Sequence, residues 1–383
     1  MGWFRAWTHR GAPFDPRRPN NFDLLRFVAA TLVLVDHCHP LTGRASRAGP
    51  FGYESLGGFA VAVFFVISGF LVAASWQRAP RILTFVVKRV LRIFPAYAAV
   101  VAVCALVLGP LLSDLAPRAY FQHNQTWSYF RNLTFFDLRY SLPNVFATNP
   151  FPHAVNGSIW TLPIEVTMYI ALAVLGCIGL MRRSLVTVLA VVLAVVWFGW
   201  AAQLRAMPPL YFNVLMTAYT VHLALWFFLG STLWVWHDQI RYRSDAAVAL
   251  VALLWATEGT RAGLILLHFA VPYLVIWAAG LPVGWMNRFG RRGDFSYGMY
   301  LYAFPVQQTL TMYGGAQWPL AFYFAASFII TLICAVASWH CIEHPALHVK
   351  ELLRRFGGRA IPAEHGPPDA GLIPRKVAGP GGP

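Results

Sequence analysis

A series of apolar stretches, most of them about 20 residues long and separated by short basic segments, constrains this chain most strongly. A helix of roughly 20 apolar residues crosses the hydrocarbon core of a bilayer. The sequence therefore predicts an all-α, polytopic integral membrane protein with about ten transmembrane helices. Counts of nine and eleven stay open, because one window is short and another is rich in Tyr and Gln. The predicted spans are 24–41, 56–77, 93–112, 159–180, 184–203, 214–236, 245–258, 261–280, 294–312 and 319–342.

Composition agrees with this class of protein. The chain is 58% hydrophobic and 12% charged, and its mean hydropathy of +0.54 excludes an ordinary soluble domain. The net charge of +15 is typical of some nucleic-acid-binding proteins, but these charges lie in the segments between apolar windows. We therefore expect contact with membrane lipid and no nucleic-acid partner. The five cysteines show no zinc or disulfide spacing, and no metal is expected.

The distribution of basic residues predicts the topology. If the N-terminus is cytoplasmic, 22 of the 30 Lys and Arg residues fall in inside segments, seven fall outside, and Arg26 lies within the first span. This asymmetry follows the positive-inside rule and predicts that both termini are cytoplasmic. We expect a cytoplasmic N-terminal segment at 1–22, a transmembrane domain at 23–347, and a Gly- and Pro-rich, disordered cytoplasmic tail at 348–383.

Two ionisable residues of the first span, Arg26 and His37, are eleven positions apart. On a helix they share one face to within about 20° and lie roughly 16 Å apart along the axis. Such groups cost on the order of 2.5–3.5 kcal/mol in a membrane and are retained mainly at interior sites. His37 is the candidate general base for deprotonating an alcohol. The alternative is a packing histidine that hydrogen-bonds a backbone carbonyl.

A carboxylate lies in the fourth predicted span, in the segment SIWTLPIEVTMYI. Glu165 precedes Tyr169 by four residues, so the two side chains share a helix face. We expect Glu165 either to hold the tautomer of His37 or to act as a base itself. The alternative is a buried structural acid paired with an arginine or a tyrosine.

A cationic stripe precedes the third span, in PRILTFVVKRVLRIFPAY. On a helix, Arg81, Lys88 and Arg92 fall within about 20° of one another, with Arg89 alongside. One interpretation is an interfacial helix attracted to anionic lipid. The other is a clamp for a phosphorylated cofactor such as coenzyme A, whose phosphates suit several arginines.

Two further spans carry polar side chains that favour a ligand site. Ser68 lies beside Gly69 in the second span, where small residues allow close helix packing or leave room for a ligand. Tyr297 belongs to FSYGMYLYAFP in the ninth span, which has more hydroxyl groups than lipid contact explains.

In order along the chain, these segments resemble the acyltransferase 3 family of multipass membrane proteins, which O-acylate bacterial polysaccharides, lipopolysaccharide, lipo-oligosaccharide signals and some macrolides. The resemblance covers about residues 20–347, and it implies transfer of an acyl group from cytoplasmic acyl-CoA to a hydroxyl, often at the outer face. The segments that carry it are FDLLRFVAATLVLVDH, GGFAVAVFFVISGFL, KRVLRIFPAY, SIWTLPIEVTMYI, FSYGMYLYAFPV and SWHCIEHP.

The resemblance also implies roles for individual residues. Arg26 and His37 match the essential pair of the family, Glu165 matches its Trp-linked acid, and its basic motif corresponds to Lys88, Arg89 and Arg92. Two departures stand out. The second span reads GFAVA at 58–62 where family members often have an acid, and Tyr302-Ala303 replaces a Trp-His pair. Because the ninth span has no histidine at this position, His37 is the one histidine expected to act as the base.

The leading hypothesis is an O-acyltransferase of the bacterial inner membrane. Donor acyl-CoA, with acetyl as the default group, is expected to bind Arg26, Lys88, Arg89, Arg92, Ser68 and Tyr297. His37 and Glu165 then serve the acceptor, a hydroxyl of a glycan, glycolipid or small metabolite. Direct transfer and a covalent acyl intermediate both stay open. A transporter or exporter of a small metabolite or lipid-linked sugar is the alternative, because many spans with buried ions also describe those proteins. A sensor or scaffold is the third hypothesis.

Overall fold

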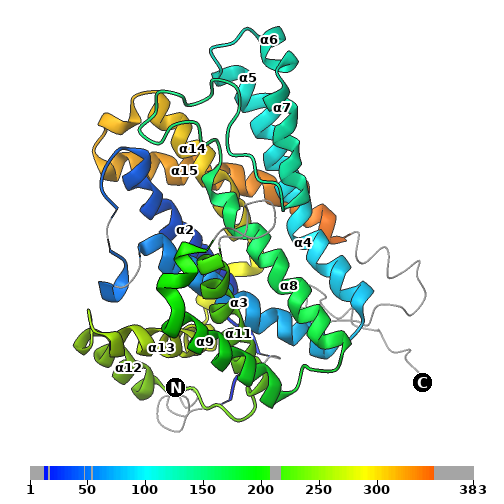
Figure 1. Cartoon of the computed structure of the whole chain (residues 1–383), viewed down its shortest axis with the longest axis vertical. Coiled ribbons are helices and arrows are strands. Elements are labelled where there is room, and N and C mark those ends of the chain that lie inside the picture. The colour runs from blue at the N-terminus through cyan, green and yellow to red at the C-terminus, as the bar shows by residue number, and fades with distance from the viewer. Residues whose placement is uncertain (1–12, 16–17, 47, 53–54, 208–216, 349–383) are drawn as a thin grey trace, which may run out of the picture.

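The computed structural model describes residues 13–15, 18–46, 48–52, 55–207 and 217–348. Within these ranges the fold is all-helical and has no β-strand (Figure 1). The predicted all-α fold class is therefore confirmed for the described part of the chain. The expected disordered tail falls almost entirely on residues 349–383, and most of the N-terminal segment falls on 1–12, so both predictions lie outside the described residues.

Eight of the described helices are long and apolar enough to cross a membrane, which makes the chain a membrane protein. They comprise α2 (Phe22–Leu41), α3 (Leu56–Arg78), α4 with its extension (Ile82–Leu112), η4 with α8 (Gly157–Cys177), α9 (Arg183–Ala206), α11 (Thr217–Val235), α13 (Arg261–Ala279) and α15 with its extension (Leu320–His348). The two other predicted spans are shorter helices: α12 (Ser244–Ala256) has 13 residues and α14 (Ser296–Met312) has 17. The count of ten spans stays a prediction.

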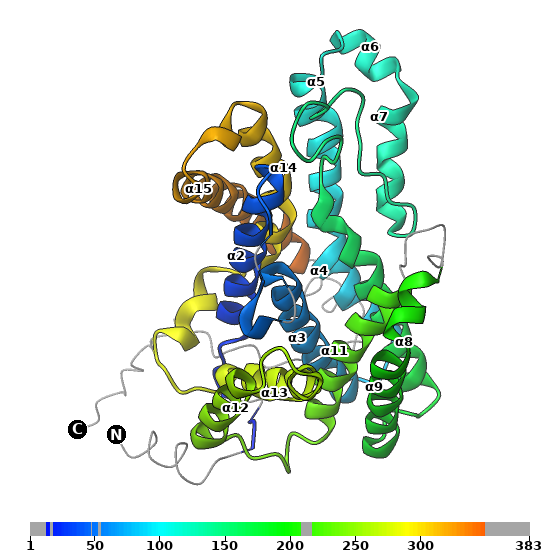
Figure 2. The same ribbon diagram turned by 60° about the vertical axis from the view of Figure 1, so that its left-hand side comes forward.

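The other named elements either form parts of these long helices or connect them. They are η1 (Pro50–Gly52), η2 (Cys104–Leu108), α5 (Gly109–Leu112), α6 (Pro117–Gln122), α7 (Asn124–Ser128), η3 (Tyr129–Thr134), η4 (Gly157–Thr161), α8 proper (Leu162–Cys177), η5 (Met286–Arg292), η6 (Gly315–Gln317) and η7 (Trp339–Glu343). Elements α5, α6 and α7 project together at one end of the molecule (Figures 1 and 2).

The cationic stripe is not an interfacial helix separate from the third span. Helix α4 runs without a break from Ile82 to Val103, with Pro95 inside it, and continues through η2 and α5 to Leu112. Its apolar side chains Leu83 and Val90 are exposed. Of the stripe, Lys88 is buried, Arg89 and Arg92 line an interior cavity, and Arg81 is exposed just before the helix. This burial favours the ligand-clamp interpretation of the stripe, and the interfacial interpretation stays a prediction. One long helix lets the apolar face meet lipid while the charged face lines the interior.

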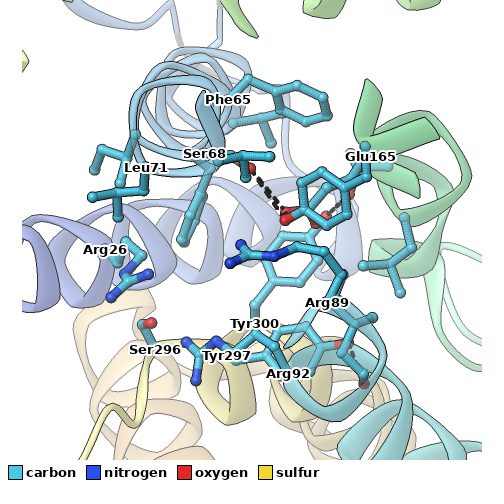
Figure 3. A pocket seen from close by; sticks show the side chains of 18 residues that line it. Arg26, Phe65, Ser68, Leu71, Arg89, Arg92, Glu165, Ser296, Tyr297 and Tyr300 are labelled. Carbon is cyan, nitrogen blue, oxygen red and sulfur yellow. Dashed lines mark hydrogen bonds between the residues drawn. The ribbon is translucent and has the colours of Figure 1, made fainter. Parts of the chain in front are cut away.

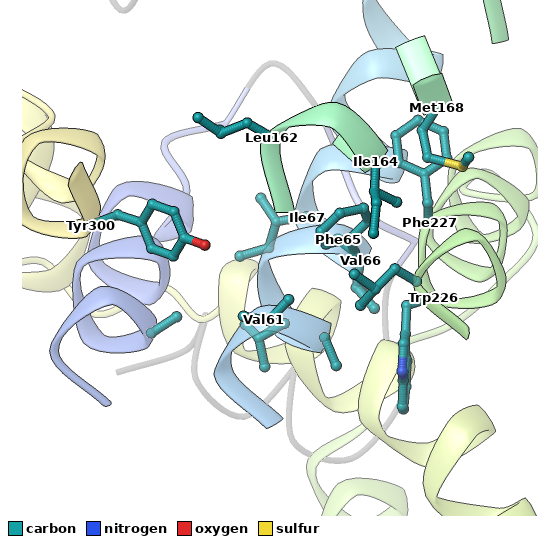
Figure 4. Close-up of a cluster of buried hydrophobic side chains, with 14 of the residues drawn as sticks. Val61, Phe65, Val66, Ile67, Leu162, Ile164, Met168, Trp226, Phe227 and Tyr300 are labelled. Carbon is teal, nitrogen blue, oxygen red and sulfur yellow. The ribbon is translucent and has the colours of Figure 1, made fainter. Parts of the chain in front are cut away.

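Helix α3 lies at the centre of the packing. Helix α2 packs between α3 and α14, α11 packs between α3 and α9, and α15 covers α14 and α2. Side chains of α3, α8 and α11 interdigitate around Phe65, Ile164 and Phe227 (Figure 4). Helices α4 and α8 lie side by side along the other flank of α3 (Figure 2). This arrangement brings α2, α3, α4, α8 and α14 around one interior space.

Helices α3 and α11 touch through their backbones at two glycines. A Cβ atom on Gly69 would lie 1.8 Å from the carbonyl oxygen of Phe227, and one on Gly230 would lie 2.1 Å from that of Val66. The hydroxyl of Ser231 donates a hydrogen bond to the Gly69 carbonyl over 3.0 Å. Small residues allow such close crossings of membrane helices. The prediction that small residues of the second span serve close helix packing is confirmed at Gly69.

We expect Gly69→Ala to lower the free energy of unfolding by about 1–3 kcal/mol, because the added methyl group forces the two backbones apart. Thermal or denaturant unfolding of the protein in detergent micelles measures this change. Gly199→Ala in α9 is the matched control, since no atom of the described residues beyond its own helix neighbours lies within 4 Å of the position of its Cβ. Equal stability of the two variants would contradict the close crossing.

Candidate functional site

An interior cavity of about 120 Å³ lies among α2, α3, α4, α8 and α14 (Figure 3). Its walls combine three arginines and one carboxylate with several hydroxyl groups, and its other lining side chains are apolar. The polar lining residues are Arg26, Ser68, Arg89, Arg92, Thr161, Glu165, Tyr169, Ser296, Tyr297 and Tyr300. A cavity with few, convergent polar groups on apolar walls is typical of a small-molecule site.

One end of the cavity is an ion-pair cluster. A terminal nitrogen of Arg26 lies 3.1 Å from Oδ2 of Asp294 and 2.5 Å from Oδ1 of Asp23. Arg92 pairs with the same Oδ2 of Asp294. The other oxygen of Asp294 accepts hydrogen bonds from the backbone N–H and the hydroxyl of Ser296. A single carboxylate therefore joins arginines from α2 and α4 to the start of α14.

Arg89 has a different environment from the other two cavity arginines. Its guanidinium lies over the rings of Tyr169 and Phe85, 5.7 and 5.8 Å from their centroids. A terminal nitrogen is 3.5 Å from the hydroxyl of Ser75. No carboxylate among the described residues forms an ion pair with it, and its Nε is buried without a hydrogen-bond partner. The Nε of Arg26 is likewise buried and has no hydrogen-bond partner within the described part of the chain.

The carboxylate of Glu165 faces the cavity from α8. Its Oε1 accepts a hydrogen bond from Tyr169, one helical turn later, and another from Ser68 over 3.3 Å. The hydroxyls of Ser68 and Tyr169 also lie 3.2 Å apart (Figure 3). Glu165 and Tyr169 thus share a face as their spacing predicts, and both point toward α3.

His37 lies beyond the other end of the cavity and does not line it. Its ring packs edge to face on Phe304, with centroids 5.3 Å apart, and its Nδ1 is buried without a hydrogen-bond partner among the described residues. Phe304 follows the cavity residue Tyr300 by four positions, which is about 6 Å along α14. Oε1 of Glu165 receives its hydrogen bonds from Ser68 and Tyr169, and within the described ranges no hydrogen bond joins Glu165 to His37. Holding the tautomer of His37 is one of the two roles predicted for Glu165.

The remaining predicted donor-binding residues divide into two groups. Ser68 and Tyr297 line the cavity together with Arg26, Arg89 and Arg92. The hydroxyl of Tyr297 donates to the Ile93 carbonyl over 3.0 Å, which ties α14 to α4. Lys88 is buried and is not among the lining residues. The basic motif thus contributes its two arginines to the cavity without its lysine.

Sequence reasoning missed Asp294 and Thr161. Asp294 comes two residues before Ser296 at the start of a helix, and this spacing was the available signal for a capping carboxylate. Its pairing with Arg26 and Arg92 depends on contacts between distant segments. Thr161 is hydrogen-bonded to the hydroxyl of Tyr300 at 2.6 Å and completes the cavity wall. Among the described residues, no three His, Cys, Asp or Glu side chains form a metal-binding group.

Comparison with known proteins agrees with this architecture. Residues 20–340 match a family model described as an acyltransferase domain. An O-acetyl transferase of Shigella phage Sf6 is 31% identical over 340 residues, which covers 85% of this chain and 95% of the relative. Nodulation protein 10 of Rhizobium leguminosarum bv. viciae is 30% identical over 373 residues, covering 87% and 95%. No solved structure matches the chain significantly.

We expect pyrophosphate at low ionic strength to raise the unfolding temperature of the protein, because a ligand that binds only the folded state stabilises it. Arg89→Gln should remove most of this shift, since Arg89 is a cavity cation without a carboxylate partner among the described residues. Arg183→Gln is the matched control, because Arg183 is an exposed arginine paired with Asp238. An equal shift in all three proteins would show that the anion binds elsewhere.

Proposed function

Because the chain belongs to the acyltransferase 3 family, as its match over residues 20–340 shows, we propose that it transfers an acyl group from acyl-CoA to a hydroxyl acceptor in the bacterial inner membrane. The protein is an acyltransferase. Acetyl is the proposed acyl group, by analogy with the O-acetyl transferase to which the chain is similar. The proposed acceptor is a hydroxyl of a cell-envelope glycan, a glycolipid or a small metabolite.

The observation that carries the donor proposal is the arginine lining of the cavity. Guanidinium groups bind phosphate oxygens through charge-assisted hydrogen bonds. A buried donor without a partner costs about 1–3 kcal/mol, and the Nε atoms of Arg26 and Arg89 are both in this state among the described residues. A phosphate that accepts hydrogen bonds from them relieves this cost. We therefore assign the phosphates of coenzyme A to Arg26, Arg89 and Arg92.

The proposed chemistry takes place toward the His37 end of the cavity. Helices α2 and α14 run parallel, since Arg26 meets Asp294 and His37 meets Phe304 farther along both helices. A donor whose phosphates bind at the first pair extends toward the second. His37 takes the proton of the acceptor hydroxyl, whose oxygen bonds to the thioester carbon. The C–S bond then breaks, and coenzyme A leaves with the proton on its sulfur.

Glu165 is the second candidate base. Its carboxylate faces the cavity directly, and Tyr169 and Ser68 hold it in place. In this role it would accept the hydroxyl proton inside the cavity, and His37 would be a packing residue. Substitution of each residue separates the two assignments.

We expect His37→Gln to lower kcat for acyl transfer by about 10²- to 10⁴-fold, the usual contribution of a general base. The KM for acyl-CoA should change little, because His37 does not line the cavity. Arg89→Gln should instead raise this KM. The assay measures free thiol released from acetyl-CoA by purified protein in nanodiscs, supplied with a lysate of candidate glycan acceptors.

Arg183→Gln serves as the control and should match the wild type in both parameters, since its side chain is exposed. Full activity of His37→Gln together with loss in Glu165→Gln would transfer the base role to Glu165. No thiol release by folded wild-type protein with acetyl-, propionyl- or succinyl-CoA would refute the proposed donor.

A further inference from the structure

Asp294 occupies a position that the proposed chemistry does not by itself explain. Its side chain is 10% exposed, and its Oδ2 contacts the guanidinium groups of Arg26 and Arg92 at once. Both hydrogen bonds to its Oδ1 come from Ser296, the first residue of α14. The carboxylate is thus held on one side by its own helix and binds two other helices with its free oxygen. Ser296 and both arginines line the cavity (Figure 3).

Two guanidinium groups at one end of a small cavity repel each other, and a low dielectric strengthens that repulsion. Arg26 projects from α2 and Arg92 from α4, so no shared backbone segment holds the two groups together. A shared carboxylate offsets the repulsion between the two guanidinium groups, because each group forms a charge-assisted hydrogen bond to the same oxygen. Within the described part of the chain, Asp23 forms an ion pair with Arg26 and none with Arg92. Among the described residues, Asp294 is the carboxylate that forms ion pairs with both arginines and so brings their side chains together.

We propose that Asp294 is a positioning residue of the donor site: it holds Arg26 and Arg92 converged at one end of the cavity so that both bind the phosphates of coenzyme A. This inference rests on the proposed function. The carboxylate does not touch the reacting atoms. It acts through the two arginines, whose remaining N–H groups, including the unpartnered Nε of Arg26, stay available to the ligand.

Titration calorimetry of the full chain in nanodiscs with free coenzyme A tests this role. We expect Asp294→Asn, which keeps the size of the side chain but removes its charge, to weaken binding roughly ten- to hundredfold, the range for lost hydrogen bonds to charged groups. Asp294→Glu should recover part of the affinity. Asp238→Asn is the matched control, because it breaks an exposed ion pair with Arg183, and such pairs contribute little.

A second measurement separates positioning from general stabilisation. In a double-mutant cycle, Asp294→Asn should weaken coenzyme A binding much less in an Arg92→Gln background than in the wild type, because the partner to be positioned is gone. In turnover, Asp294→Asn should raise the KM for acyl-CoA and leave kcat within a few-fold of the wild type. If Asp294→Asn does not fold, the coenzyme A affinities of Asp294→Glu and Arg92→Gln are compared with that of the wild type instead.

The outcomes distinguish the two proposals. Wild-type protein that does not bind coenzyme A refutes the proposed donor. Wild-type protein that binds it, together with equal or tighter binding by Asp294→Asn, refutes only the positioning role, and tighter binding would mean that Asp294 competes with phosphate for the arginines. Additive effects in the double-mutant cycle would also overturn the inference.

Discussion

Charge burial within an apolar helix bundle is the constraint on which the site depends. A guanidinium among membrane helices is retained only where it is paired or faces an interior cavity, and Arg26 and Arg92 satisfy both conditions through Asp294. This cluster ties together α2, α4 and α14, three elements that are far apart in the sequence. The cavity is the space left between them, and α3 and α8 close its other sides. The same ion pairs therefore hold the three helices together and form one end of the cavity.

The parallel course of α2 and α14 gives the site two chemically different ends. The cavity end is charged where Arg26 lies beside Asp294, and His37 packs on Phe304 beyond the opposite end. Glu165 faces the cavity from α8. For an acyltransferase this polarity suits a donor with an anionic head and a reactive thioester at its far end, and the acceptor would then meet the thioester near the imidazole.

Much of this was predictable from the sequence, because helical periodicity reports which residues share a face. It correctly places Tyr169 on the face of Glu165 and turns Arg89 and Arg92 to one side of α4. Periodicity does not report which helix covers that face. The pairing of Asp294 with arginines of two other helices was therefore missed. Of the two roles predicted for Glu165, the one that orients His37 has no supporting hydrogen bond among the described residues. The third span was predicted to begin at residue 93, whereas α4 begins at Ile82 and runs continuously through Pro95.

A structure of the protein with coenzyme A bound in nanodiscs tests the central claim most directly. The account predicts that the phosphates contact Arg26, Arg89 and Arg92, and that the pantetheine arm follows the cavity so that its sulfur lies at the His37 end. Phosphates bound outside the arginine-lined cavity, or a sulfur that lies at the Asp294 end, would contradict it.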